Sequence, residues 1–257
     1  MRVWIASLLF YLSVFAFCEF LRYLNQKFLA PRYPYPSELV NEFIGTIQIC
    51  APMFDVNFIL ENYGLKGVLF EIIFIEVMNA TLQRDAIADP CPLIYGFIQG
   101  TVTLRRLASL LTVQFIAGYT SYLIARAFWS FGIHAIHLEA LEGECGADLT
   151  VTVIYGSLVE AGGLITAKAA EVFLEQRILN EKQLSFIQAV VAGVITVLGI
   201  HLTGMYANPI VAWACTFNCG DVPYLAHFTV YWVAPVLAWH IADQYLKTPQ
   251  EVPEKED

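Results

Sequence analysis

Two short polar motifs, Asp89-Pro90-Cys91 and Asn208-Pro209-Ile210, lie within apolar stretches of the sequence. The second closes the run L-T-G-M-Y-A-N-P-I over 202–210, and no Asp, Glu, Lys or Arg occurs between Lys182 and Asp221. Asn and Asp cap helix N-termini and Pro suits the first helical position, so each motif predicts the start of a helix. Inside a membrane the polar groups of such a start must be satisfied, which indicates that both motifs face a pore.

Two glutamates precede these motifs at matching distances. Glu42 stands in the run N-E-F-I-G-T, 47 residues before Asp89, and Glu160 stands in V-E-A-G-G-L-I-T, 48 residues before Asn208. The match predicts a duplicated chain, and three helices per half give the two halves opposite orientations in the membrane. We predict that both carboxylates accept hydrogen bonds from the backbone of the two loops; simple packing between helices is the alternative.

The composition identifies the class of protein. Of the 257 residues, 58% are hydrophobic and 14% are charged, whereas about a quarter of a typical soluble domain is charged. The acids cluster at 139–148 and 251–257, and this distribution excludes a nucleic-acid partner. The cysteines and histidines show no metal-ligand spacing, and no nucleotide or catalytic motif occurs. We therefore predict an integral protein of the lipid bilayer that is not an enzyme and uses no cofactor or metal.

Long apolar segments are the elements that would position these residues. Seven are long enough to cross a bilayer: 3–21, 38–60, 67–83, 104–130, 149–174, 184–206 and 226–246. Two shorter segments, 90–100 and 208–218, follow the two motifs and are predicted to be re-entrant half-helices. The predicted fold is an all-α integral membrane protein, with six transmembrane helices and two half-helices in an inverted repeat and an extra N-terminal apolar helix.

We divide the chain into three parts. Residues 1–30 carry the extra apolar helix, for which a cleaved signal peptide is the alternative; Glu19 and the lack of a small-residue cleavage site favour an uncleaved helix. Residues 31–247 form the membrane domain, with one repeat at about 38–130 and the other at about 149–247. Residues 248–257 are predicted to be a disordered acidic tail.

Basic residues predict the orientation in the membrane. If the segments after the first alternate in direction, nine flanking Lys and Arg residues fall on one side, and the acidic loop 139–148 falls on the other. The basic residues are Arg22, Lys27, Arg32, Arg84, Arg105, Arg106, Arg177, Lys182 and Lys247. This arrangement predicts a cytoplasmic C-terminus. A disulfide that involves Cys145 or Cys219 is compatible with the other side, and the sequence leaves its presence open.

Two half-helices that enter from opposite faces would meet N-terminus to N-terminus near the middle of the membrane. Each N-terminus has unpaired N–H groups and about half a positive charge, so the pair repels cations and protons. The Asn208 amide would meanwhile hold a passing water oxygen. This arrangement predicts passive, single-file movement of a small solute past Asn208 and Asp89.

The sequence resembles the aquaporin superfamily, also called the major intrinsic proteins, over nearly all of residues 38–247. The resemblance rests on E-F-I-G-T, R-R-L-A-S-L-L-T-V-Q-F-I-A-G, V-E-A, L-T-G-x-x-x-N-P and V-Y-W-V-A-P-V-L-A. A cysteine in the first box, an additional apolar N-terminus and the lack of a filter arginine are similar to the divergent subcellular branch, the superaquaporins. The resemblance implies a homotetramer with one pore per subunit. It also implies an intracellular membrane such as that of the endoplasmic reticulum, with the plasma membrane as the alternative.

The two boxes depart from the family pattern, in which each reads Asn-Pro-Ala. Asp89 replaces the first Asn; an ionised carboxylate there would weaken the barrier to cations, whereas a protonated one would keep a donor. Cys91 and Ile210 replace the two alanines and are expected to pack the half-helices together.

The family's selectivity filter corresponds here to Thr196, Met205 and Val211, with Val211 in place of the arginine. Its fourth position does not align without a gap. A filter of these side chains lacks a fixed cation, so we expect it to be wide and apolar and to pass solutes of glycerol size.

The predicted function is a passive membrane channel for water and for small neutral solutes such as glycerol and hydrogen peroxide. Two alternatives stay open. One is a poorly conducting structural or regulatory membrane protein, and the other is a cation-permeable channel that uses Asp89.

Overall fold

A computed structural model describes residues 1–246 of the protein, so the predicted acidic tail at 248–257 lies outside the described residues. The described part consists of helices and connecting loops, without a β-strand. The helices are α1 (Val3–Leu24), α2 (Pro34–Cys50), α3 (Val56–Leu82), α4 (Pro90–Ile98), α5 (Leu104–Trp129), α6 (Ala135–Glu142), α7 (Val153–Glu175), α8 (Glu181–Thr203), α9 (Pro209–Thr216), α10 (Tyr224–Phe228) and α11 (Ala234–Tyr245). A π-helical turn, Thr229–Val233, joins α10 to α11, and a second, Asn25–Leu29, follows α1.

The long helices have the length and composition of membrane spans. Within the described residues, five stretches meet both criteria: Val3–Leu29, Pro34–Leu82, Leu104–Trp129, Glu181–Thr203 and Tyr224–Tyr245. The second is 49 residues long because it contains α2 and α3, and α7 has 23 residues but carries Glu160, Lys168 and Glu171. The all-α membrane fold is therefore confirmed.

Gly64 divides α3 and marks the boundary between two predicted segments. Its φ of 64° and ψ of −166° lie outside the helical region, in a conformation that favours glycine. The chain folds back at this point, since a Cβ on Gly67 would contact both Tyr63 and Ile59. The two parts of α3, 56–63 and 65–82, agree with the predicted break between 38–60 and 67–83.

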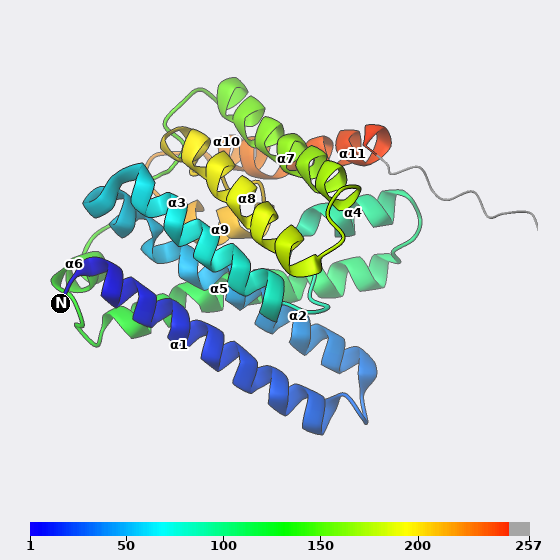
Figure 1. Ribbon diagram of the computed structural model, residues 1–257, viewed down its shortest axis with the longest axis horizontal. Helices are drawn as coiled ribbons and strands as arrows, with labels where there is room; N and C mark the ends of the chain where they lie inside the picture. The colour runs from blue at the N-terminus through cyan, green and yellow to red at the C-terminus, as the bar shows by residue number, and fades with distance from the viewer. Residues whose placement is uncertain (247–257) are drawn as a thin grey trace, which may run out of the picture.

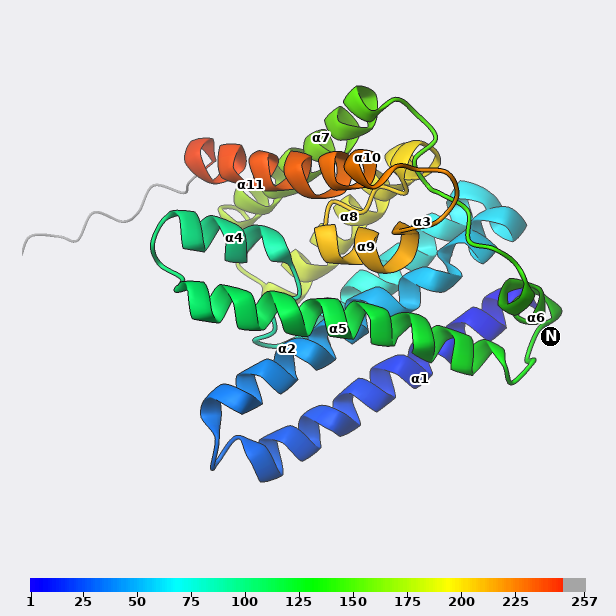
Figure 2. The same ribbon diagram turned by 180° about the vertical axis from the view of Figure 1, so that it is seen from behind.

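The helices pair in a pattern that relates the two halves of the chain. Helix α2 packs on α5 in the first half, as α7 packs on α11 in the second, and α3 packs on α8 between the halves. The short helix α4 packs on α11 of the other half, and α9 packs on α5 in the same way (Figures 1 and 2). This exchange of short helices between halves is the pairing that an inverted repeat requires.

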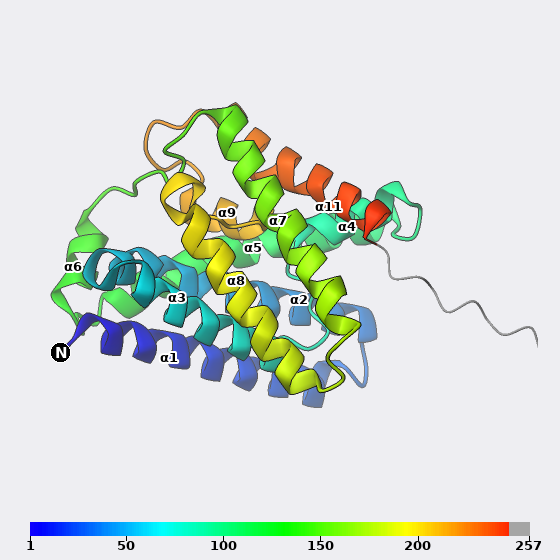
Figure 3. The same cartoon turned by 45° about the horizontal axis from the view of Figure 1, so that its top comes forward.

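Helix α1 belongs to the core of the first half. It packs against α2 and α3, and Phe10, Phe15 and Cys18 on its inner face are at most 2% exposed. Tyr11 donates a hydrogen bond to Glu71 of α3 across this interface. In the second half α7 and α8 lie directly side by side, whereas α2 and α3 make little contact with each other (Figure 3). The extra helix thus covers the gap between α2 and α3.

Helix α6 was not predicted. It lies in the loop between α5 and α7, and its His137 is completely buried with Nε2 at 3.3 Å from Asp55 Oδ2. Trp129 of α5 donates a hydrogen bond to Asp55 Oδ1 at 2.8 Å. These contacts hold the loop against the start of α3 and the end of α5.

Candidate pore between the two half-helices

The two half-helices begin at the predicted motifs. Pro90 is the first residue of α4 and Pro209 the first of α9. Asp89 Oδ1 accepts a hydrogen bond from Cys91 N at 2.8 Å, and Asn208 Oδ1 accepts one from Ile210 N at 3.0 Å. Each side chain therefore satisfies one N–H group at its own helix start.

A hydrogen bond joins the two helix starts. Asn208 Nδ2 donates to the carbonyl oxygen of Ala88 at 3.0 Å, and Ala88 is the residue before Asp89. An amide NH₂ group has two hydrogens, so Asn208 keeps a second donor after this bond. The two starts lie end to end in the interior, above α5 in Figure 2.

Glu42 holds the loop that leads into α4. Its Oε2 accepts a hydrogen bond from Ile87 N at 2.8 Å, and its Oε1 accepts from Ala88 N at 2.8 Å and from Gln114 Nε2 of α5 at 2.6 Å. The Glu42 side chain is only 2% exposed. Three donors thus satisfy this buried side chain without an adjacent cation.

Glu160 holds the loop that leads into α9 in the same register. Its Oε2 accepts from Ala207 N at 2.7 Å, and its Oε1 accepts from Tyr206 N at 3.2 Å and from Thr203 Oγ1 at 2.5 Å. Each glutamate thus binds the two residues that precede the capping side chain. Ala88 and Ala207 also share a left-handed backbone, with φ of 49° and 48°, which costs a non-glycine residue about 1–2 kcal/mol.

Two cavities lie along one face of α8. The inner cavity, of about 300 Å³, is lined on α8 by residues that include Ser185, Gln188 and Ala192, and opposite them by Glu76 of α3 and Glu171 of α7. The outer cavity, of about 20 Å³, is lined on α8 by Thr196 and Ile200. Positions three or four apart share one face of a helix, so the same stripe of α8 lines both cavities.

The rest of the outer cavity comes from distant segments. Its further lining residues are Met53, Val56, Asn57, Asp148, Gly204 and Tyr206. A water molecule needs about 10–15 Å³, so the outer cavity has room for one. Within the described residues, no cluster of three or more His, Cys, Asp or Glu side chains is arranged to hold a metal ion.

Comparison with known proteins gives relatives along most of the chain. It is 25% identical to aquaporin-11 of Milnesium tardigradum over 92% of its length and 84% of that protein, and 22% identical to mouse aquaporin-12 over 92% and 83%. It is 22% identical to human aquaporin-11 over 79% of its length and 75% of that protein. The chain is similar to members of the aquaporin superfamily along most of its length. No family model matches the sequence. The similarity to these relatives supports a multi-pass membrane protein and a membrane channel of the aquaporin family.

The three residues that correspond to the family filter lie in different surroundings. Thr196 lines the outer cavity. The Met205 side chain lies between Gly163 of α7 and Gly199 of α8, since a Cβ on either glycine would overlap it. Val211 packs with Met53 and Tyr206, two lining residues, and is 6% exposed.

The outer cavity is lined by one of the three predicted filter residues, Thr196, whereas Met205 and Val211 are not among its lining residues. Tyr206 and Asp148 line it as well, and they add a phenol and a carboxyl group to its wall. The wide, apolar filter stays a prediction.

Cys91 and Ile210 each pack against residues of the other repeat. Cys91 lies against Leu164 of α7 and Ala238 of α11, in the opposite half of the chain. Ile210 lies against Cys50, at the end of α2, and Val211. Each residue therefore anchors its half-helix to the other repeat, and the two half-helices are joined by the bond from Asn208 to Ala88.

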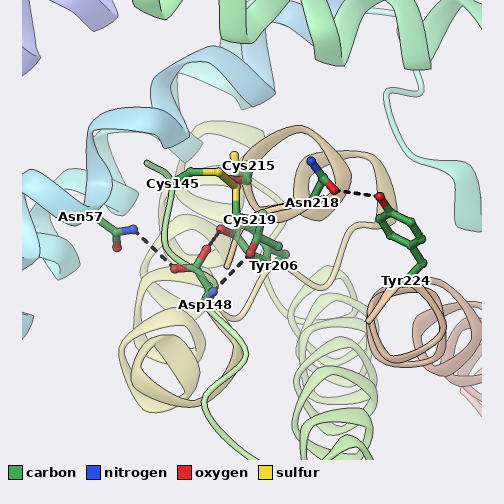
Figure 4. Close-up of a disulfide and its surroundings, with 9 residues drawn as sticks. Asn57, Cys145, Asp148, Tyr206, Cys215, Asn218, Cys219 and Tyr224 are labelled. Atoms are coloured by element: carbon green, nitrogen blue, oxygen red, sulfur yellow. Dashed lines mark hydrogen bonds between the residues drawn. A yellow bond between two sulfur atoms is a disulfide. The ribbon is translucent and has the colours of Figure 1, made fainter. Parts of the chain in front are cut away.

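The loop that ends at α7 is fastened near the outer cavity. A disulfide joins Cys145 to Cys219, three residues beyond α9 (Figure 4). Asp148 accepts hydrogen bonds from the Tyr206 hydroxyl and, at 3.4 Å, from Asn57 Nδ2. Burial raises the pKa of the Asp148 carboxyl above its ordinary value, and hydrogen bonds from Tyr206, Asn57 and Thr216 partly offset the rise.

Sequence reasoning missed Gln114, Tyr206 and Asp148 as neighbours of the candidate pore. Gln114 stands inside the quoted run of the third repeat helix, where an isolated amide among apolar residues signals a buried partner. Tyr206 is part of the run that ends in Asn208, and Asp148 is one of four acids in a loop without basic residues. No sequence signal distinguishes Asp148 from Glu139, Glu142 and Glu144.

Proposed function

We propose that this protein is a passive channel for water, with a pore that runs from the inner cavity past Asn208 and Asp89 to the outer cavity. The observation that supports it most is the hydrogen bond that joins the two helix starts. The two cavities on one face of α8 would be the two ends of the passage. The two glutamates fix the loops on either side of this junction in matching register. Pore residues so fixed need no rearrangement to receive a solute.

The proposed passage uses few polar groups. Water would enter the inner cavity, accept a hydrogen bond from the second amide hydrogen of Asn208, and leave past Thr196. The two helix N-termini place partial positive charges at the junction and oppose the passage of cations. Asp89 supplies negative charge at one of these ends, which lowers that barrier if the carboxylate is ionised.

The size of the outer cavity favours water over larger neutral solutes. A cavity of about 20 Å³ has room for one water molecule, and hydrogen peroxide or glycerol would require it to widen. We therefore propose water as the first permeant, with peroxide next and glycerol last.

The assembly, location and division of the chain are also proposals. The family resemblance supports a homotetramer in the endoplasmic reticulum membrane with a cytoplasmic C-terminus. The burial of Phe10, Phe15 and Cys18 supports retention of residues 1–30, because cleavage would expose the first repeat. Residues 31–247 would form the channel domain.

Water flux through liposomes tests the function. Vesicles with the purified protein should shrink at least several-fold faster than empty vesicles after an osmotic jump in a stopped-flow instrument. Ala192→Trp, on the inner cavity wall, should abolish the gain, whereas Leu198→Trp, on the exposed side of α8, should not. Equal rates with and without the protein would contradict a water channel and favour a poorly conducting membrane component.

The Asp89 carboxylate favours one second candidate, a cation-permeable channel. This candidate requires a current across a planar bilayer that disappears in Asp89→Asn. The absence of current alongside rapid water flux would remove it.

A further inference from the structure

The outer cavity is closed by contact between three segments that are far apart in the sequence. Asn57 comes from the start of α3, Asp148 from the loop before α7, and Tyr206 from the loop before α9. All three line the cavity, and hydrogen bonds from Asn57 and Tyr206 converge on Asp148. The width of the passage therefore depends on where the loop holds Asp148.

Tyr206 is held at both ends. Its backbone N–H donates to Glu160, and its hydroxyl donates to Asp148. The ring meets that of Tyr231 edge-on at 5.8 Å between centroids, and Tyr231 is itself fixed by a hydrogen bond of 2.8 Å to Thr203 O. The ring therefore occupies the side of the cavity in a single orientation.

Asp148 is held between two anchors of its own loop. On one side, the Cys145–Cys219 disulfide is reinforced by a hydrogen bond of 3.1 Å from Gly220 N to Cys145 O. On the other, Thr150 N donates to Leu202 O at 3.1 Å and Thr150 Oγ1 donates to His201 O at 2.7 Å. Asp148 N also donates to Thr216 Oγ1 of α9 at 3.2 Å. Figure 4 shows this loop beside the disulfide, with Asp148 directed at Asn57 and Tyr206.

We propose that Tyr206 and Asp148 are specificity-determining residues, which form the outer constriction of the pore and restrict it to solutes of water size. The Cys145–Cys219 disulfide positions this constriction by holding the loop that carries Asp148. Without the Tyr206 ring or the disulfide, the passage widens enough to admit a three-carbon polyol such as glycerol. This inference rests on the proposed function, since it presumes that the two cavities belong to one pore.

Thiol labelling at Thr196 tests the constriction without requiring a conducting pore. Thr196→Cys is placed in the protein with Cys215→Ser, so that the remaining free cysteines (Cys18, Cys50 and Cys91) are buried. A charged methanethiosulfonate is added to liposomes from the side of the loop, and intact mass spectrometry gives the labelling rate. The same protein with Thr196 intact measures the background.

We expect Tyr206→Ala to raise the labelling rate at least tenfold over that of the reporter protein alone. Tyr206→Phe, which keeps the ring and loses the bond to Asp148, should give a smaller rise. The double variant Cys145→Ser/Cys219→Ser should approach the rate of Tyr206→Ala. If Tyr206→Ala does not fold, Asp148→Ala opens the same contact from the loop side and should also raise the rate.

Tyr224→Ala is the matched control. Tyr224 lies in the same region, donates a hydrogen bond of 2.8 Å to Asn218, and does not line the outer cavity. It should leave the labelling rate unchanged. The proposal would be overturned if the reporter protein, with Tyr206 and Asp148 intact, were labelled at position 196 as fast as its Tyr206→Ala and Asp148→Ala variants.

Solute flux in the same vesicles separates this inference from the proposed function. The parent protein should pass water and exclude glycerol, and Tyr206→Ala should pass both. If the parent passes neither but labelling still rises in Tyr206→Ala, the constriction is supported and the water channel is not. If the parent already passes glycerol as fast as Tyr206→Ala does, the specificity role is wrong.

Discussion

The two loops before α4 and α9 share a backbone but differ in the side chain that caps the helix. In each, a glutamate from the first helix of its repeat binds the two preceding N–H groups, and an alanine adopts a left-handed conformation just before the cap. The cap is Asp89 in one loop and Asn208 in the other. The glutamate and the alanine, which both loops share, set the geometry of the junction. The capping side chain, which differs, sets the charge of the junction and its hydrogen-bond donors.

The surroundings of the two loops differ as well. In the first half, α1 fills the space beside α2 and α3, whereas α7 and α8 in the second half pack on each other. The second half has the disulfide, which fixes the chain just after α9. The two glutamates therefore support equivalent loops through the same hydrogen bonds. The contacts that hold the helices together differ between the two halves.

The largest expected effect comes from removal of the shared support. In Glu160→Gln, one carboxylate oxygen becomes an NH₂ group that faces backbone N–H groups, so buried donors on that side lose their acceptor. We expect a loss of about 3–5 kcal/mol in the free energy of unfolding, measured by SDS titration in detergent, because each buried donor left without an acceptor costs about 1–3 kcal/mol and the facing N–H groups repel each other. Glu42→Gln should behave alike if the two loops are equivalent.

Glu175→Gln provides the control for this pair. Glu175 is exposed at the end of α7, the helix that carries Glu160. Its substitution should change the free energy of unfolding by less than about 0.5 kcal/mol. A small effect of Glu42→Gln beside a large one of Glu160→Gln would show that the first loop depends on its surroundings instead.

The next effect tests the packing that only the first half has. Phe15→Ala removes a ring buried among α1, α2 and α3 and leaves a cavity. We expect a loss of about 2–3 kcal/mol, below the 3–5 typical of soluble cores because lipid, not water, receives the chain in the reference state. Leu12→Ala, on the 45% exposed side of α1, should cost far less. Equal losses in the two variants would mean that α1 is not part of the core.

A smaller effect is expected from exchange of the cap in the second loop. Asn208→Asp keeps the acceptor for Ile210 N but sets a carboxylate oxygen against the carbonyl of Ala88. We expect a loss of about 1–3 kcal/mol, since a buried hydrogen bond is replaced by two facing acceptors. Thermal unfolding followed by intrinsic fluorescence measures it, and an unchanged midpoint would argue against the bond between the two loops.

The sequence was sufficient to predict the repeated architecture, because the signals for it are local or periodic. Apolar segments predict the helices, and the Asn-Pro and Asp-Pro pairs predict where the two half-helices begin. The matching distances of these pairs from Glu160 and Glu42 indicate a duplication. The predicted break between 38–60 and 67–83 is local as well, since Gly64 between these segments adopts a backbone conformation that favours glycine.

What the sequence could not predict depends on contacts between distant segments. Met205 stands at a filter position of the family, yet two glycines on α7 and α8 give its side chain a place away from the outer cavity. His137 showed no ligand spacing, and its partner Asp55 lies 82 residues away. The pairing of Cys145 with Cys219 likewise depends on how the loop returns to α9.

The smallest structural effect, and the one that refines the comparison most, is expected from Asp89→Asn. Asn and Asp cap helices about equally well, so the free energy of unfolding should change by less than about 0.5 kcal/mol. The variant makes the two caps identical and removes the capping carboxylate at the start of α4, so the partial positive charges of α4 and α9 are opposed less than before. Any cation leak in vesicles, measured with a potential-sensitive dye, should therefore fall while water flux is kept. A fall in water flux with unchanged stability would instead mean that the Asp89 carboxylate accepts a hydrogen bond from the passing water. The first loop would then supply an acceptor to the pore, and Asn208 in the second loop would supply a donor.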